Sequence, residues 1–177
     1  GAYQSYMEKF SLPEEKKIKD LSRGMRMKYA LVLALSHEAE LFILDEPTSG
    51  LDPLVRSELI EILKDIVLEE NKTVLMSTHI TSDLDKIADY LFFLFDGQII
   101  LQGQKDEIKE GHAVVKGDAS ALPPDYENYF VGISKSAYGF EGLTDKKAAL
   151  KKLLPVNTVY EVPTIEDIML YYIRRHK

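Results

Sequence analysis

The stretch that most constrains this chain runs from Leu41 to Asp52. Four apolar residues lead directly into two adjacent carboxylates, Asp45 and Glu46, and then into a turn that contains proline and glycine. A short, uninterrupted apolar run is typical of a strand buried on both faces of a parallel sheet. Open α/β sheets place ligands at the carboxyl ends of such strands, and successive strand residues point to opposite faces. The pattern predicts a site in which one carboxylate holds a metal and the other activates water; the alternative is a solvated strand end.

The residues after Asp52 alternate between helical and strand patterns. Asp52 and Pro53 are a typical N-cap and first helical residue, and apolar residues at helical spacing continue to about Glu70. A strand is expected at residues 73–77 and a helix at 82–88. A second strand at 90–95 and a returning strand at 98–101 are expected to form a hairpin, with Asp96 and Gly97 as its turn. Strands joined by short helical crossovers indicate an α/β fold with a parallel sheet.

His79 lies just after the second strand, as Asp45 and Glu46 lie just after the first. A single histidine is usually a polar residue with satisfied hydrogen bonds rather than a catalyst. Here two strands end in side chains that can act in catalysis, two carboxylates and an imidazole, at one sheet edge, and this favours a functional site instead.

A second candidate site precedes the first strand, at Leu21 to Met25. Ser22 is an expected N-cap of a helix that continues through residues 26–35. The free N–H groups and the dipole of a helix start attract anions, and Gly24 lets a ligand approach the backbone. From Glu14 to Lys28 there are six basic and three acidic residues, which favours a polyanion such as a triphosphate. The alternative is a simple helix cap beside a solvated basic face.

The overall composition narrows the functional classes. The chain has 177 residues, 45% of them hydrophobic and 29% charged, as in soluble globular proteins. Its net charge of -7 provides no global basic field for nucleic acid. The absence of cysteine excludes disulfides and thiolate metal sites, and no apolar run approaches the roughly 20 residues that span a bilayer.

The two ends of the chain have a different character. Gly1 and Ala2 resemble a cloning scar, so the chain is expected to be a piece of a longer protein. Within the first 20 residues, Pro13 is expected at the first position of a helix. Residues 104–177 are expected to form a small α+β appendage without catalytic spacing, a packing or partner-binding module. Its expected helices are 105–110, 146–154 and a final one after Pro163, its expected strands are 113–116 and 129–133, and residues 156–162 are expected to be extended.

Four motifs in fixed order resemble the nucleotide-binding domain of ATP-binding-cassette (ABC) proteins. Leu21–Met25 is similar to the LSGGQ signature, Leu41–Glu46 to Walker B with its adjacent glutamate, Ser49–Asp52 to the D-loop that follows it, and Ser77–His79 to the switch-histidine strand. Together these motifs are highly specific. Residues 1–103 therefore resemble the C-terminal portion of an ABC ATPase domain, part of a P-loop NTPase-like parallel sheet, and residues 104–177 resemble the variable extension of bacterial exporter ATPases.

The sequence departs from the family pattern in two ways. Arg23 and Met25 stand where the signature has glycine and glutamine, although Ser22 and Gly24 are kept. No Gly-x4-Gly-Lys-Ser/Thr phosphate loop and no Q-loop occur in the 177 residues. The resemblance therefore implies a chain that starts inside the helical subdomain and does not hydrolyse ATP alone.

The resemblance also implies roles for individual residues, with ATP and Mg²⁺ as cofactors. Asp45 would hold the metal, Glu46 would activate the attacking water, and His79 would contact the γ-phosphate. The nucleotide-binding residues, which would meet the ATP of a second ABC ATPase subunit in a head-to-tail dimer, are Ser22, Arg23, Gly24, Met25 and Asp52. For Asp52 the role of helix cap is the alternative.

The implied function is the energy-coupling ATPase of a membrane exporter. Such a subunit lies in the cytoplasm, peripheral to the inner face of the cell membrane, and docks on membrane-spanning permease subunits, with no nucleic acid partner. Two alternatives stay open. One is a soluble ABC-type ATPase that acts on DNA or ribosomes, and the other is a non-catalytic interaction module.

Overall fold

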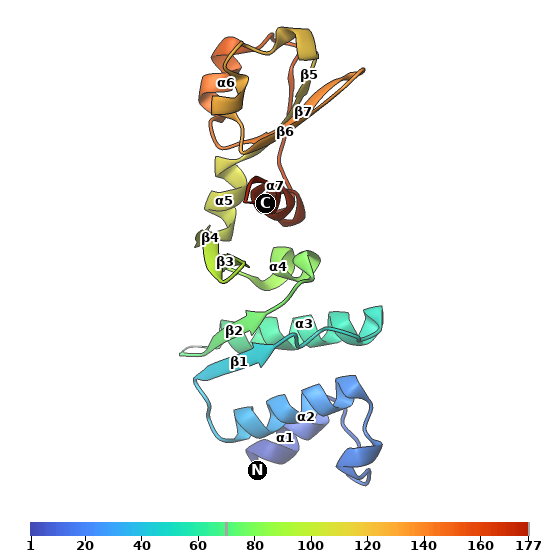
Figure 1. The fold of residues 1–177 in the computed structure, drawn as a ribbon. Coiled ribbons are helices and arrows are strands. Elements are labelled where there is room, and N and C mark those ends of the chain that lie inside the picture. Colours follow the sequence, from blue (N-terminus) through green and yellow to red (C-terminus); the bar gives the residue numbers. More distant parts are fainter. Residues whose placement is uncertain (70, 177) are drawn as a thin grey trace. The chain divides into compact units, whose positions relative to one another are not determined.

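The computed structural model describes residues 1–69 and 71–176. The chain divides into two compact units, Gly1–Asp83 and Leu84–Lys177 (Figure 1). Both units combine helices and strands, so the expected α/β composition is confirmed.

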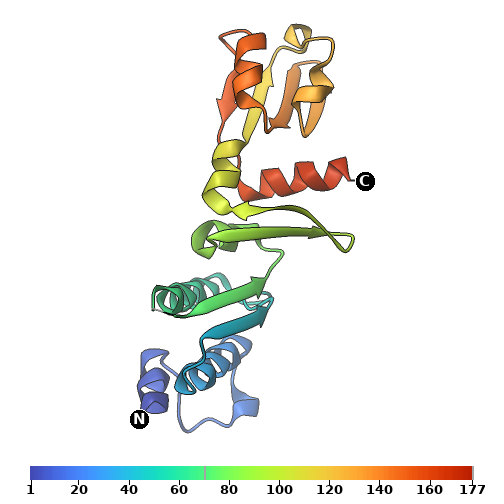
Figure 2. The same cartoon turned by 90° about the vertical axis from the view of Figure 1, so that its left-hand side faces the viewer.

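The first unit carries the elements predicted around the acidic pair. Its helices are α1 (Ala2–Lys9), η1 (Ile18–Asp20), α2 (Arg23–Ser36) and α3 (Pro53–Leu68), its strands are β1 (Leu41–Asp45) and β2 (Thr73–Ser77), and α4 (Thr81–Ile87) begins at its end. Glu70, where α3 was expected to end, lies outside the described residues. Strands β1 and β2 run parallel, in a register that pairs Asp45 with Ser77, and their arrows point the same way in Figure 1. Helix α3 packs against β2 (Figure 2).

Local capping explains where the two long helices begin. The Ser22 hydroxyl accepts a hydrogen bond from the Met25 N–H at 3.3 Å. Asp52 Oδ1 accepts from the N–H groups of Leu54 and Val55, each at 3.1 Å, and Pro53 is the first helical residue. Both predicted N-caps are therefore confirmed.

The expected helix start at Pro13 is wrong. Helix α1 ends at Lys9, and Ser11 adopts a positive φ of 55°, which turns the chain back. The Leu12 N–H then donates to the Met7 carbonyl at 2.9 Å, and both side chains are buried. Burial of these apolar residues outweighs the local preference of Pro13 for a helix start.

The expected burial of the first strand is also wrong. Strand β1 is not buried on both faces, since Phe42 is 3% exposed and Ile43 is 71% exposed. Among the described residues β1 pairs with β2 alone, so few neighbours cover it. Strand β3 (Tyr90–Phe95), in the second unit, pairs antiparallel with β4 (Gln98–Gln104), the expected returning strand. Asp96 and Gly97 both have positive φ, 47° and 74°, as a tight two-residue hairpin turn requires.

The rest of the second unit is an antiparallel sheet with helices, as expected. The sheet has the order β6-β7-β5-β8, from β6 (Gly132–Ser136), β7 (Gly139–Thr144), β5 (Ala113–Gly117) and β8 (Val159–Glu161). The helices are α5 (Lys105–Gly111), η2 (Ala119–Ala121), η3 (Tyr126–Tyr129), α6 (Lys147–Leu153) and α7 (Ile165–Arg175). Strand β7 was not predicted, and β6 begins three residues later than expected. The strand pattern is weak here because Gly142 replaces a side chain where the Gly132 carbonyl and Phe130 approach.

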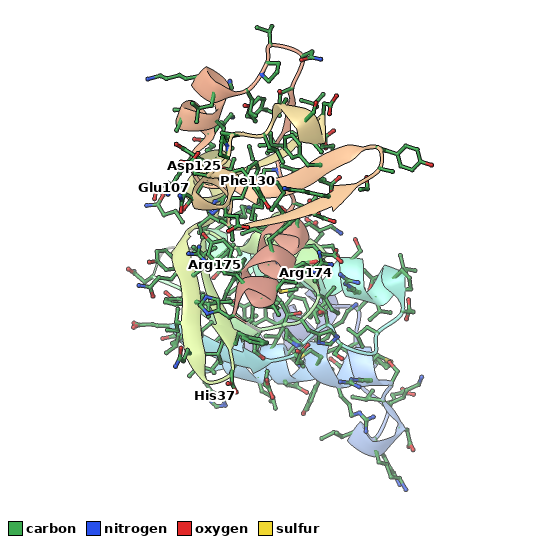
Figure 3. The ribbon with its side chains drawn as sticks, turned by 45° about the horizontal axis from the view of Figure 1, so that its top comes forward. His37, Glu107, Asp125, Phe130, Arg174 and Arg175 are labelled. Carbon is green, nitrogen blue, oxygen red and sulfur yellow. The ribbon has the colours of Figure 1, made fainter. Side chains whose placement is uncertain are left out.

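Helix α7 shows why the end of the chain folds as predicted. Thr164 and Asp167 form a reciprocal capping box at its start. Arg174 and Arg175, labelled in Figure 3, lie in its last turn, where positive charge suits the helix dipole.

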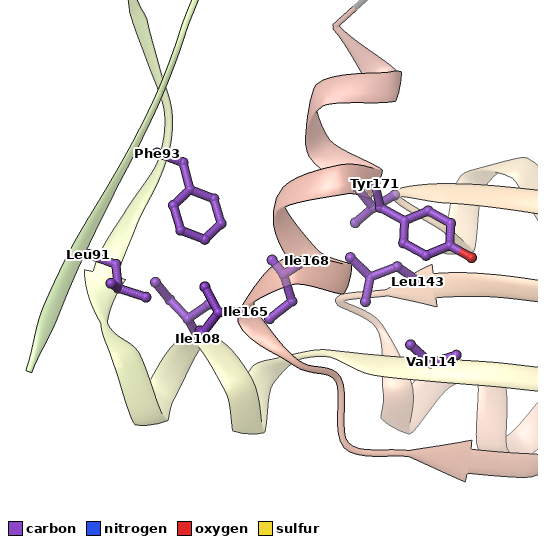
Figure 4. Packing of buried hydrophobic residues seen from close by; sticks show 9 residues of the cluster. Leu91, Phe93, Ile108, Val114, Leu143, Ile165, Ile168 and Tyr171 are labelled. Atoms are coloured by element: carbon purple, nitrogen blue, oxygen red, sulfur yellow. The ribbon is translucent and has the colours of Figure 1, made fainter. Parts of the chain in front are cut away.

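The main core of the second unit joins the β3–β4 hairpin to the appended sheet. Leu91 and Phe93 of β3 lie in one buried cluster with Ile108 of α5 and with Ile165 and Ile168 of α7 (Figure 4). This packing explains why the compact units divide after Asp83, twenty residues before the expected division at residue 103. The assignment of residues 1–103 to the ATPase domain and of 104–177 to an extension stays a prediction.

A buried histidine in this unit is fully hydrogen-bonded. His112 Nδ1 lies 2.7 Å from the Ile108 carbonyl oxygen, which can only accept, so Nδ1 donates. Burial raises the pKa of the Tyr172 phenol, which therefore stays protonated and can donate to His112 Nε2 at 2.9 Å. Both ring nitrogens are used structurally.

Replacing Ile168 with alanine tests whether the hairpin belongs to the second unit. Ile168 is 0% exposed, so Ile168→Ala should lower the free energy of unfolding by about 2–5 kcal/mol. Amide hydrogen exchange should speed up at Leu91 and Phe93 as well as in the β5–β8 sheet. Leu170→Ala, on the same helix at a residue 39% exposed, is the control and should change stability much less. Unchanged exchange at Leu91 and Phe93 would contradict the assignment.

Candidate functional site

The acidic pair and the segment that leads to His79 meet at one edge of the β1–β2 sheet. The Ser77 hydroxyl donates to Asp45 Oδ1 at 2.5 Å. The Glu46 N–H donates to both the backbone carbonyl and the hydroxyl oxygen of Ser77, each at 3.1 Å. These bonds extend the parallel pairing one residue beyond β1. Ser77 was part of the predicted motif, but its role in fixing both carboxylate residues was not predicted.

Glu46 and His79 are in direct contact. Glu46 Oε1 lies 2.8 Å from His79 Nδ1 and accepts the His79 backbone N–H at 3.1 Å. The other oxygen, Oε2, is buried and has no hydrogen-bond partner among the described residues. Buried polar atoms are usually satisfied by protein or by ordered water. One carboxylate oxygen is thus anchored by His79, and the other has no partner among the described residues.

The backbone at Glu46 separates the two carboxylates. Glu46 has a φ of 47°, a left-handed conformation that costs a non-glycine residue about 1–3 kcal/mol. The Ser77 bonds and a turn in which the Ser49 N–H donates to the Glu46 carbonyl at 3.2 Å hold it there. Asp45 therefore meets Ser77 while Glu46 meets His79, through a change in backbone conformation rather than through strand alternation alone.

The signature-like segment has a structural role that the sequence did not reveal. Gly24 is buried, and a Cβ added there would lie 2.3 Å from Val55 Cγ1 of α3. A glycine is required at this position because α2 packs closely on α3. Ser22 and Arg23 are exposed and Met25 is partly buried. In the described part of the chain no hydrogen bond or ion pair joins the Ser22–Met25 segment to Asp45, Glu46 or His79.

Two further charged residues near α2 have local partners. Lys28, one of the six basic residues, forms an ion pair with Glu58 at 2.7 Å. Asp52 is exposed and caps α3 through Oδ1. The capping role of Asp52 is thus observed, and its predicted contact with nucleotide across a dimer stays a prediction.

Asp45 fits a magnesium ion that arrives with a nucleotide. It is an exposed carboxylate at the strand end, and the residues described here contain no group of three or more His, Asp or Glu that could hold a metal. Mg²⁺ usually keeps several waters and binds one or two carboxylates plus phosphate oxygens, not an all-protein cage. A single carboxylate is therefore sufficient from the protein side.

Within residues 1–69 and 71–176, no helix is both long enough and apolar enough to cross a membrane.

Comparisons with known proteins find relatives among ATP-binding proteins of transporters. A family model described as "AAA domain, putative AbiEii toxin, Type IV TA system" matches residues 11–84. The lantibiotic transport ATP-binding protein SrtF of Streptococcus pyogenes is 37% identical over 93 residues, 52% of this chain and 40% of SrtF. The thiamine import ATP-binding protein ThiQ of Salmonella choleraesuis (strain SC-B67) is 40% identical over 103 residues, 58% of this chain and 42% of ThiQ.

Structural similarity points to the same class. The structure of cbiO1 from Clostridium perfringens, part of the ABC transporter complex cbiONQ, matches with a TM-score of 0.54 and 29% identity, over 60% of this chain and 43% of that chain. The likeness confirms the expected P-loop NTPase-like fold and the resemblance to ABC transporter ATP-binding proteins. The chain spans about two fifths of the length of these curated relatives.

Replacing Gly24 with alanine tests its packing role. Because the new Cβ would overlap Val55 Cγ1, Gly24→Ala should lower the free energy of unfolding of the first unit by about 1–3 kcal/mol. Val55→Ala in the same protein should recover much of the loss, as a double-mutant cycle by denaturant unfolding would measure. Gly111→Ala is the control, since nothing lies within 4 Å of a Cβ there. A Gly24→Ala protein as stable as the parent would exclude a tight α2–α3 contact.

Proposed function

We propose that this chain supplies the Walker B, D-loop, switch-histidine and signature parts of an ABC-type ATPase. The observation that carries the proposal is the contact of 2.8 Å between Glu46 and His79, at the ends of two adjacent parallel strands. Asp45 beside them adds a carboxylate suited to Mg²⁺. A base, a metal ligand and a histidine at one strand edge form one part of the set that ATP hydrolysis requires, and a phosphate loop is the other part.

Each residue of this set has a distinct chemical task. Glu46, held by His79 through Oε1, would accept a hydrogen bond from the attacking water and take its proton, a general-base effect of about 10²–10⁴-fold. The exposed His79 imidazole, oriented by Glu46, would contact the terminal phosphate. Asp45 would hold Mg²⁺ through water, and the ion when bound neutralises phosphate charge.

The signature-like helix start would serve the nucleotide of a second subunit. Ser22 and Gly24 lie at the N-terminus of α2, where backbone N–H groups and the helix dipole favour anions. Arg23, Met25 and Asp52 would contribute to the same face of a head-to-tail dimer with a second ABC ATPase subunit. The exposure of Ser22, Arg23 and Asp52 supports this role.

The proposed process is ATP-driven export, with membrane-spanning permease subunits as partners and a location on the cytoplasmic side of the membrane. Relatives named as lantibiotic transport and thiamine import proteins support a transporter role. The export direction rests on the resemblance of residues 104–177 to the extension of exporter ATPases. Co-purification with membrane subunits separates this proposal from a soluble ABC-type ATPase.

Glu46→Gln tests the assignment of the general base. In a protein that joins these residues to a phosphate loop, the variant should bind ATP with near-parental affinity, because the amide keeps the shape and the hydrogen bonds. Steady-state hydrolysis should fall about 10²–10⁴-fold. Glu61→Gln, at a side chain 65% exposed that pairs with Lys64, is the matched control and should hydrolyse ATP normally. Normal turnover by Glu46→Gln would reject the assignment.

The 177-residue chain alone should not hydrolyse ATP, because it contains no phosphate-loop sequence. Phosphate release by the purified chain, measured with and without Glu46→Gln, should be indistinguishable from a blank. Turnover that disappears with Glu46→Gln would show that these residues are sufficient. Inactivity here together with activity when a phosphate loop is present separates the ATPase from a non-catalytic interaction module.

A further inference from the structure

A buried carboxylate lies behind the loop that follows Glu46. Asp83 is 0% exposed, and its Oδ2 accepts a hydrogen bond from the Thr48 hydroxyl at 2.7 Å. Its Oδ1 accepts from Nε and Nη2 of Arg56 at 2.8 and 2.7 Å. A buried charge persists only when it is paired and hydrogen-bonded, and these three bonds meet that requirement.

This network connects the segments that carry the proposed site. Thr48 is two residues after Glu46 and is 1% exposed. Asp83 follows His79 by four residues, in the first turn of α4. Arg56 lies near the start of α3, the helix that Asp52 caps. The network therefore ties the loop after Glu46 to the helix after His79 and to the start of α3.

The proposed site needs such a support. The His79 side chain is 71% exposed and that of Glu46 is 34% exposed, and polar contacts this open to solvent stabilise little by themselves. Glu46 is also held at a positive φ of 47°, which persists only when its surroundings impose it. Fixing Thr48 adds to the Ser77 bonds that hold this backbone, and the Thr48 carbonyl, which accepts the Leu51 N–H at 3.3 Å, shapes the loop that follows.

We propose that Thr48, Arg56 and Asp83 are positioning residues that keep Glu46 and His79 in reacting geometry. The proposal rests on the proposed ATPase function. The three residues act through the loop and α4 and contact no reacting atom. A misplacement of about 1 Å at a reacting group can cost about 10²-fold in rate, so a remote buried hydrogen bond can control turnover.

The first test measures geometry without activity, on the 177-residue chain. Thr48→Val keeps the side-chain shape and removes the hydroxyl, whereas Thr48→Ser keeps the hydroxyl. Amide exchange at the Leu51 N–H and at the His79 N–H, which donates to Glu46, should speed up about tenfold in Thr48→Val and stay near the parental rate in Thr48→Ser. Thr144→Val is the control, because its buried hydroxyl donates to the Tyr129 carbonyl at 2.6 Å in the second unit.

The second test measures turnover in a protein that also carries a phosphate loop. Thr48→Val should lower kcat about 10–100-fold with little change in KM for ATP. Thr48→Ser should restore most of kcat. Arg56→Lys removes the two-nitrogen contact with Asp83 while keeping the charge, and it should lower kcat in the same way if Thr48→Val fails to fold.

The outcomes separate the inference from the function on which it rests. If Glu46→Gln turns over normally, the proposed function fails. If Glu46→Gln is inactive but Thr48→Val has parental kcat, or if Leu51 and His79 exchange at parental rates, the positioning role fails alone. If Thr48→Val speeds exchange equally at all amides of the first unit, the network is merely stabilising, and the inference is overturned.

Discussion

The hydrogen bonds from the Glu46 N–H to Ser77 are the interaction on which the site depends. They occur because the β1–β2 register pairs Asp45 with Ser77, and they hold the first residue beyond the strand in a left-handed conformation. A slip of one residue in this register would move every side chain of β1 to the other face and would separate Glu46 from His79. The apolar residues of β1 and β2 therefore do more than form a sheet, because their alignment sets the geometry of the polar residues that follow.

Features encoded by neighbouring residues could be predicted from the sequence. The helix starts at Ser22, Asp52 and Thr164 follow from local capping. The turn at Asp96 and Gly97 follows from the Asp-Gly pair, and both residues have the positive φ that such a turn requires. The meeting of Glu46 and His79 was predicted because parallel strands place their carboxyl ends together. The contacts of Asp83 with Thr48 and Arg56 could not be predicted, since they join residues 35 and 27 positions apart without a periodic signal.

Gly24 and β1 illustrate how one residue pattern can satisfy two constraints. The sequence explained Gly24 by approach of a ligand, and the structure adds contact with Val55. This contact fixes the start of α2 relative to α3, whose own start is fixed by Asp52, so the signature-like segment and the D-loop segment are held by one packing contact. In β1 the apolar pattern indicated burial on two faces, yet Ile43 is 71% exposed. An apolar pattern indicates that the faces of a strand are suited to burial, but the strand's own sequence does not identify the element that packs on each face.

His112 and His79 both lie next to strands, but they differ in burial and in hydrogen bonding. His112 comes just before β5, is buried, and has both ring nitrogens hydrogen-bonded. His79 follows β2, is exposed, and within the described residues only its Nδ1 has a ring contact, with Glu46. The carboxyl ends of parallel strands open toward ligands, whereas His112 enters an antiparallel sheet beside a covering helix. The direction of the adjacent strand, more than the residue type, therefore decides which histidine remains free for chemistry.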